Sequence, residues 1–107
     1  DRVKAAMVLA YAERVQSRRP FELTCLALDP VRIVNLPGES FIEYQLHAQS
    51  VAPDAFVAVA GYGDCPMGYI CLDQAFSDRG GYEQTWSFTG PCERLYRGAI
   101  KRLVTTA

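Results

Sequence analysis

A strand, a helix and a second strand follow one another over residues 31–61, and this order constrains the fold more than any other feature. "VRIVNL" at 31–36 is rich in apolar and β-branched residues. "AFVAVAG" at 55–61 has apolar residues at both odd and even positions, which predicts a central strand covered on both faces. Residues 39–51 carry apolar groups on two helical faces, which predicts a helix buried on both sides. Such a crossover is right-handed and makes its two strands parallel.

The segments on either side predict a hairpin and two more helices. "FELTCLAL" at 21–28 is joined to the first strand by the turn dipeptide Asp29-Pro30, which is typical of a hairpin. Helical spacing over residues 2–17 and after Pro91 predicts one helix at each end. At 107 residues, 50% of them hydrophobic, the chain has the size of one domain. We expect a single α/β domain over 1–107, bordering on α+β, in which a small mixed sheet of about three strands packs with three helices.

The charge balance excludes two classes of partner. The formal net charge is -1, so electrostatics gives no reason to expect nucleic acid or an anionic membrane. No stretch approaches the roughly 20 apolar residues that span a bilayer, so we expect no transmembrane segment. The chain opens on Asp1, without an initiator Met or the apolar centre of a signal peptide. This start predicts a processed chain or a piece of a longer protein.

Four cysteines leave the redox compartment open. Cys25 falls in a strand pattern, which predicts a buried thiol. Cys65, Cys71 and Cys92 fall on loops or at a helix start, where a bridge among them is compatible with an oxidising compartment. This favours a secreted or periplasmic location. The absence of a CxxC pair argues against a zinc knuckle.

The predicted crossover also indicates where a ligand would bind. The two parallel strands end at the same edge of the sheet, and ligands in such sheets bind outside those ends. Glu39 follows the first strand through the corner Pro37-Gly38, and a long loop over 61–90, rich in glycine and aromatic residues, follows the second. At a helix start Glu39 is expected to stay ionised, either as an anionic ligand or simply as a residue that stabilises the helix. Asp73, in the loop, is expected to serve a turn or a cap, as is Asp64.

Four short motifs occur in order, ahead of the closing helix: "LPGE" at 36–39, "VAVAGYGD" at 57–64, "GYI" at 68–70 and "GGYE" at 80–83. With these motifs, residues 22–104 resemble the carboxyl-terminal part of the catalytic domain of the neutral/alkaline, non-lysosomal ceramidases. The chain is most similar to the short bacterial relatives of that family. The resemblance implies a zinc-dependent amidase of sphingolipid metabolism, a hydrolase that cleaves the N-acyl amide of N-acylsphingosine.

The resemblance also implies roles for three side chains. The Glu of the PGE corner is a zinc ligand in the family, and its match is Glu39. "GYGDCPMGYI" is similar to the family's "GLxNxYTHYI", which makes Tyr69 the match of a tyrosine ligand. Tyr82 matches, one residue further along than expected, a catalytic tyrosine that lies against the substrate amide. Without the resemblance, both tyrosines are equally well interpreted as aromatic residues that pack in the loop.

The chain departs from the family in its histidines. The family binds zinc with two further histidines from a preceding segment, whereas the single histidine here, His47, lies too far along the predicted helix to join Glu39. The family's "THY" reads "MGY". We therefore expect half of a zinc site, inactive unless an upstream segment of the same protein supplies histidines. The alternatives are a non-catalytic α/β binding or assembly module without the metal, and a disulfide-stabilised secreted domain of unrelated role.

Overall fold

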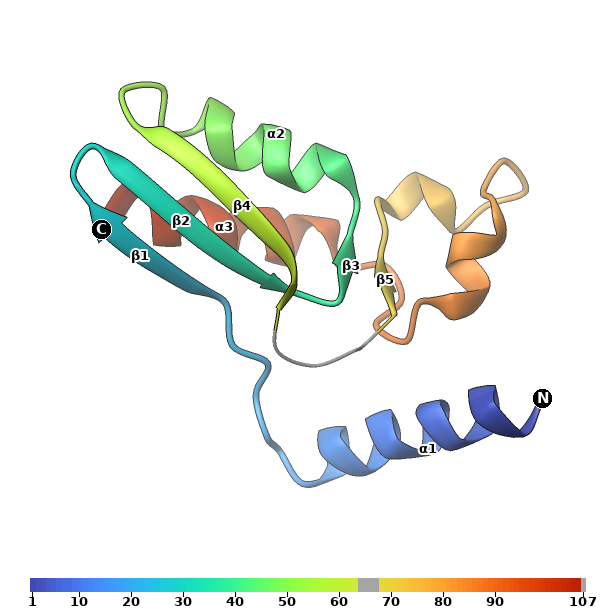
Figure 1. Cartoon of the computed structure of the whole chain (residues 1–107). Helices are drawn as coiled ribbons and strands as arrows, with labels where there is room; N and C mark the ends of the chain where they lie inside the picture. Colours follow the sequence, from blue (N-terminus) through green and yellow to red (C-terminus); the bar gives the residue numbers. More distant parts are fainter. Residues whose placement is uncertain (64–67, 107) are drawn as a thin grey trace.

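The computed structural model describes residues 1–63 and 68–106 and contains a mixed α/β fold (Figure 1). Its main sheet has the strand order β1-β2-β4, with β1 spanning Thr24–Leu28, β2 Val31–Pro37 and β4 Phe56–Gly63. β1 and β2 form the predicted antiparallel hairpin. β2 and β4 are parallel and are connected by α2 (Ile42–Ser50). The predicted fold class, hairpin and crossover are confirmed.

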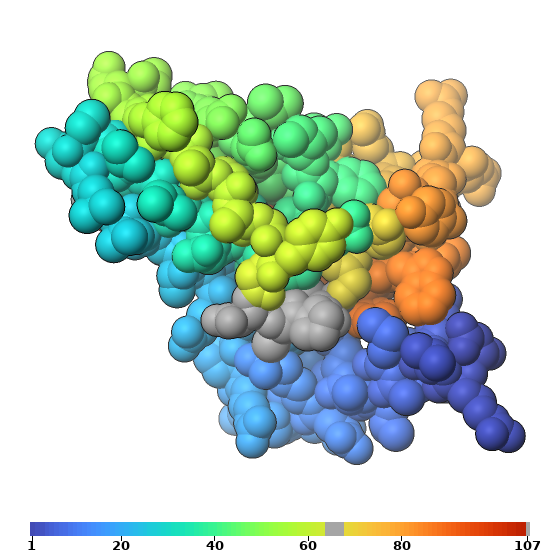
Figure 2. All heavy atoms as spheres, viewed as in Figure 1, coloured from blue at the N-terminus to red at the C-terminus, as the bar shows by residue number. Residues whose placement is uncertain are grey.

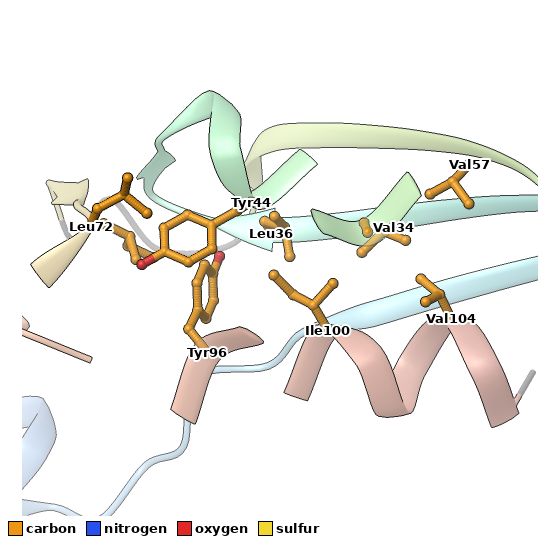
Figure 3. Close-up of a cluster of buried hydrophobic side chains, with 10 residues drawn as sticks. Val34, Leu36, Tyr44, Val57, Leu72, Tyr96, Ile100 and Val104 are labelled. Carbon is orange, nitrogen blue, oxygen red and sulfur yellow. The ribbon is translucent and has the colours of Figure 1, made fainter. Parts of the chain in front are cut away.

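The core lies between one face of this sheet and the two helices α2 and α3 (Glu93–Thr106) (Figure 3). The rings of Tyr44 in α2 and Tyr96 in α3 meet edge to face, with centroids 4.6 Å apart. The fully buried Tyr44 hydroxyl donates a hydrogen bond to the Cys71 carbonyl oxygen at 2.6 Å. The aliphatic part of the core is formed by Val34, Leu36, Val57, Ile70, Leu72, Ile100 and Val104.

The opposite face of the sheet is open to solvent, which corrects two predictions. β4 is an edge strand rather than the central one, and β2 takes the centre. Leu26, Leu28 and Phe56 alternate with the core residues and are 53, 57 and 69% exposed. The apolar run of β4 therefore reflects one covered and one uncovered face, because helices lie on one side only. α2 likewise buries one face only, since its Ile42 and Leu46 are exposed.

Helix α1 (Arg2–Gln16) was predicted correctly, yet it contributes no buried residue. It lies beside the sheet rather than on it (Figure 1). Its main attachment is Tyr11, which stacks on Phe21 at 5.6 Å between centroids and touches the Phe88 ring at 6.0 Å. Lys4 lies over the Trp86 ring at 5.1 Å. The helix is thus held mainly by ring contacts, and only Tyr11 packs, partly buried, against the core.

Short elements occupy the region that was expected to be a long loop. β5 (Tyr69–Ile70) pairs in parallel with the two-residue strand β3 (Glu39–Ser40), and two 3-10 helices follow, η1 (Asp73–Ala75) and η2 (Tyr82–Trp86). The N–H of Glu93 donates to Asp73 Oδ1 at 3.1 Å, and the N–H of Asp73 donates to Glu93 Oε1 at 3.0 Å. This exchange ties η1 to the start of α3 and confirms the cap role predicted for Asp73. The same prediction for Asp64 lies outside the described residues.

The cysteines differ in part from expectation. Cys25 is only partly buried, because it lies on an edge strand. Cys71 is fully buried, and Cys25, Cys71 and Cys92 are all free thiols. The structure therefore contains no bridge between Cys71 and Cys92, while Cys65 lies outside the described residues. Within residues 1–63 and 68–106, no helix has the length and apolar character needed to cross a bilayer.

Candidate functional site at the β3–β5 edge

Glu39 and Tyr69 lie directly opposite each other in the small parallel sheet. The Glu39 N–H donates to the Gly68 carbonyl oxygen at 2.9 Å, and the Phe41 N–H donates to the Ile70 carbonyl oxygen at 3.1 Å. Paired strands run about 4.8 Å apart, and paired residues project from the same side of the ribbon. Two residues separated by a whole crossover therefore meet on one edge of the molecule.

The position of Glu39 differs from the one predicted. It belongs to β3 and not to the first turn of α2, which begins at Ile42 and has Glu43 as its first-turn acid. The corner at Gly38, whose φ is 61°, turns the chain from β2 into this second strand before the helix starts. Helix-start electrostatics therefore does not explain Glu39. Its backbone is instead paired with that of β5.

Tyr82 joins the same cluster from η2. Its hydroxyl oxygen lies 2.8 Å from that of Tyr69, and the two rings stand nearly perpendicular, with centroids 5.8 Å apart. The Tyr82 side chain is 63% exposed, so the contact is on the surface. Figure 2 shows the carboxyl end of β4 (yellow-green) and η2 (orange) on the same face of the molecule. The structure brings all three predicted site residues together.

The hydrogen bond to Tyr82 raises the pKa of Tyr69 above that of an ordinary tyrosine, and desolvation and the negative charge of Glu39 raise it further. A raised pKa keeps the phenol neutral at pH 7. Either hydroxyl can be the donor of the bond between Tyr69 and Tyr82. Each hydroxyl has one proton and can also accept, so whichever one accepts in this bond retains its proton for another acceptor.

Sequence reasoning missed a fourth residue, Tyr62, at the end of β4. Its N–H donates to the Gly38 carbonyl oxygen at 2.9 Å, directly before Glu39. The neighbouring Glu39 side chain, mainly through hydrogen bonding, raises the pKa of Tyr62 above the ordinary tyrosine value. The Tyr62 side chain is 73% exposed, so it is not a core residue. The available signal was an aromatic residue between two glycines at the end of a strand, in "GYG".

The donors at this edge fit part of a zinc site. Zinc sites take four ligands, usually from cysteine, histidine and carboxylate side chains. Glu39 supplies one carboxylate and Tyr69 one phenol. Among residues 1–63 and 68–106, no group of three or more histidine, cysteine, aspartate or glutamate side chains is arranged to hold a metal. The described chain thus offers two oxygen donors and lacks the nitrogen donors that would complete the set.

His47 is not part of this cluster. Its Nε2 lies 3.0 Å from the Arg97 carbonyl oxygen, so the ring connects α2 to α3. His47 therefore has a structural partner in α3, and the expectation that it does not join Glu39 agrees with this position.

Comparisons with family models, curated proteins and solved structures give no match to this chain. An interpretation of the site therefore depends on the residues quoted from the sequence and on the geometry at the β3–β5 edge.

Proposed function

We propose that this chain is the terminal part of a zinc-dependent amidase of the neutral ceramidase type. Glu39 and Tyr69 would be metal ligands, and Tyr82 would contact the substrate amide. The observation that carries the proposal is the meeting of these three residues on one edge, through the β3–β5 register and the 2.8 Å contact between the Tyr69 and Tyr82 hydroxyls. The resemblance named the same three residues from the sequence alone.

The hydrogen bond between Tyr69 and Tyr82 is compatible with this division of roles. Zinc, when bound, supplies a Lewis acid that polarises an amide carbonyl and acidifies a water molecule. Glu39 offers an anionic oxygen. If Tyr69 donates to Tyr82, the neutral Tyr69 keeps an oxygen lone pair for the metal. Tyr82 then has its own proton, which it can donate to a carbonyl oxygen as negative charge develops there.

The reaction would be hydrolysis of an N-acyl linkage. Water adds to the carbonyl carbon, the C–N bond breaks, and a carboxylic acid and an amine are released. By resemblance, the substrate is the lipid amide of N-acylsphingosine. Two further zinc donors would come from histidines in an upstream segment of the same protein, so we expect this chain to be inactive alone.

A decisive test uses the longest natural product that contains this sequence. Zinc content and hydrolysis of an N-acylsphingosine are measured for wild type, Glu39→Gln and Tyr69→Phe. We expect both variants to lose zinc and activity, because each removes one of the four metal donors. Glu22→Gln and Tyr11→Phe make the same chemical changes away from the site, at an exposed residue and in the α1 contact, and should retain both. Unchanged zinc content in both site variants would remove the assignment.

This chain can also be tested with the nitrogen donors added from outside. Cobalt(II) replaces zinc as a coloured probe, and imidazole replaces the histidine side chains. We expect the visible spectrum of four-coordinate cobalt only when chain, cobalt and imidazole are all present. The spectrum should disappear in Glu39→Gln.

A second candidate function is a non-catalytic α/β binding or assembly module. The observation that favours it is the donor set, since His47 is engaged with Arg97 and the β3–β5 edge carries no described histidine. This candidate predicts that the longest natural product contains no zinc and that Glu39→Gln leaves its binding properties unchanged.

A further inference from the structure

We propose that the outer face of the main sheet is an interface for a second copy of this chain. The outer face is the side of β1, β2 and β4 that points away from the core. The two copies pack on it sheet to sheet, about a two-fold axis that runs along β2. The interface contains no residue of the β3–β5 edge, so the proposal does not depend on the metal site or on the proposed function.

The outer face carries no charge. Three rows of three residues cross the strands on this face, and they alternate along each strand with residues that point to the core, such as Val34 and Val57. Two of the rows are entirely apolar: Leu28, Val31 and Phe56 form the first, and Leu26, Ile33 and Ala58 form the second. A sheet face that meets solvent is ordinarily polar. This one has the composition of a buried face.

No described part of the chain covers the two apolar rows. Leu28 and Phe56 are 57 and 69% exposed, and Leu26 is 53% exposed. The helices that pack on the sheet lie on its other side: α3 passes behind the strands in Figure 1, and Figure 2 shows β2 (cyan) and β4 (yellow-green) at the front in the same view. Contiguous apolar patches mark interaction sites, whereas single scattered residues do not.

The absence of charge favours the same surface as the partner. In a two-fold interface the same patch is used by both copies, so a charged side chain near the axis would meet its own counterpart. None of the nine outward residues is charged, and the interface therefore contains no repulsion between like charges.

The sizes of the facing side chains also suit this symmetry. A two-fold axis along β2 places β1 of one copy over β4 of the other and keeps each row on its own counterpart, because packed sheets hold their strands within about 30° of each other. In the second row Leu26 then lies over the partner's small Ala58, and Ile33 meets its own counterpart. In the first row Phe56 lies over the partner's Leu28. Large residues set against small ones fill the space between two layers.

The third row forms a polar rim at the carboxyl end of β2. It consists of Thr24, Asn35 and Ala60. The Asn35 side chain donates to Thr24 Oγ1 at 3.2 Å, so these polar groups have a partner within their own copy. The row is the last one, because β4 bulges directly after it: Gly61 and Tyr62 together stand opposite Leu36.

The size of the face determines the strength of the dimer. Three rows of three residues face the partner, whereas an interface of standard size has about 20–30 residues on each side. Interfaces of standard size have dissociation constants from the μM to the pM range. We therefore expect a weak dimer, with a Kd in the micromolar range or above.

The dimer is tested by sedimentation equilibrium of this chain from about 1 μM to about 1 mM, the range in which such a Kd is measured. We expect the average mass to rise with concentration from that of one chain toward twice that value. Leu26→Lys should keep the chain monomeric, because the symmetry buries the unpaired charge twice. The matched control is Leu46→Lys on α2, since Leu46 is 54% exposed, and it should associate like wild type. A mass of one chain at every concentration, or equal loss of association in both variants, would overturn the proposal.

The two-fold arrangement is tested by exchanging sizes in the second row. Ala58→Leu adds apolar surface but sets two large side chains against each other at the partner's Leu26, so it should weaken the dimer by about tenfold or more. Adding Leu26→Ala to Ala58→Leu restores one large and one small residue at each contact and should recover the dimer. Circular dichroism verifies the fold of each variant. Tighter association of Ala58→Leu would indicate unspecific apolar contact and contradict the arrangement.

A different occupant of the outer face gives a different result. If another segment of the same protein covers the face, the longest natural product that contains this chain stays monomeric, and Leu26→Lys lowers its melting temperature while Leu46→Lys does not. That result would overturn the proposal. A concentration-dependent dimer of the longest natural product that is lost only in Leu26→Lys supports it.

Discussion

The hydroxyl oxygens of Tyr69 and Tyr82 lie 2.8 Å apart, although the two residues are thirteen positions apart along the chain. The segment between them folds through η1 and returns in η2. Tyr69 is paired at the same time with Glu39 across β3 and β5. One phenol therefore connects the strand that carries the carboxylate to the helix that carries the exposed tyrosine.

Replacing Tyr82 by phenylalanine should separate substrate contact from metal binding. The variant loses the hydroxyl that is hydrogen-bonded to Tyr69, so the pKa of Tyr69 should fall toward that of an ordinary tyrosine. In the longest natural product kcat should fall by about 10²- to 10³-fold, the range for loss of one donor to a developing oxyanion, with zinc content unchanged. Steady-state kinetics and metal analysis check this, and a loss of zinc would mean that Tyr82 acts through the metal site.

Alkaline pH should destabilise the protein through its buried tyrosines. Burial raises the pKa of Tyr96 to about 12 and raises that of Tyr44 as well. Because the unfolded chain ionises near pH 10, the stabilising effect of these groups is complete below pH 10 and is lost as pH rises through the folded-state values. Urea unfolding midpoints measured between pH 8 and 12 should fall above pH 10, and Tyr96→Phe should reduce the slope. A midpoint that stays flat up to pH 12 would contradict this account.

The Tyr44 hydroxyl should matter for stability at neutral pH. Tyr44→Phe keeps the ring contact with Tyr96 but leaves the Cys71 carbonyl oxygen without the 2.6 Å hydrogen bond inside the core. An unsatisfied buried acceptor costs about 1–3 kcal/mol, so the free energy of unfolding at pH 7 should fall by that amount. The control is Tyr11→Phe, whose ring lies in the partly buried contact with Phe21 and should change stability by less than about 0.5 kcal/mol. Equal effects of the two variants would show that the hydrogen bond contributes little.

The two glycines around Tyr62 should respond differently to alanine. A Cβ at Gly63 would meet the Leu36 carbonyl oxygen at 2.8 Å, whereas a Cβ at Gly61 would meet nothing within 4 Å. Gly63→Ala should therefore destabilise the chain by about 1–3 kcal/mol, the usual cost of overpacking, and Gly61→Ala should be tolerated. Thermal unfolding of both variants checks the pair. A larger loss in Gly61→Ala would contradict the close approach of β4 to β2.

The hairpin and the crossover could be predicted because their signals are local. The turn dipeptide Asp29-Pro30 and the apolar runs on either side determine the strands without reference to the rest of the chain. The place of β4 in the sheet could not be predicted. Apolar residues at both odd and even positions occur in a strand covered on both faces, and also in a strand whose outer residues, such as Phe56, remain exposed.

The sequence allowed the residues of the candidate site to be predicted, but not their positions in the fold. Glu39 was assigned to a helix start because a strand of two residues has no periodicity of its own, and only its pairing with Tyr69 defines it. Tyr62 was missed because its direction depends on a register shift between β2 and β4, which is a long-range property. Both errors concern pairing between distant segments, where sequence periodicity carries no information.

The bulge in β4 separates two parts of one strand that have different structural roles. Residues 56–60 follow the register of β2 and belong to the scaffold, whereas the N–H of Tyr62, in the bulge, donates to the Gly38 carbonyl oxygen directly before Glu39. Substitutions in the first part should change how firmly the sheet is held together, and substitutions at Tyr62 should change the corner that leads into Glu39. The two properties can therefore vary separately, over generations or in a redesigned protein, within a single segment of eight residues.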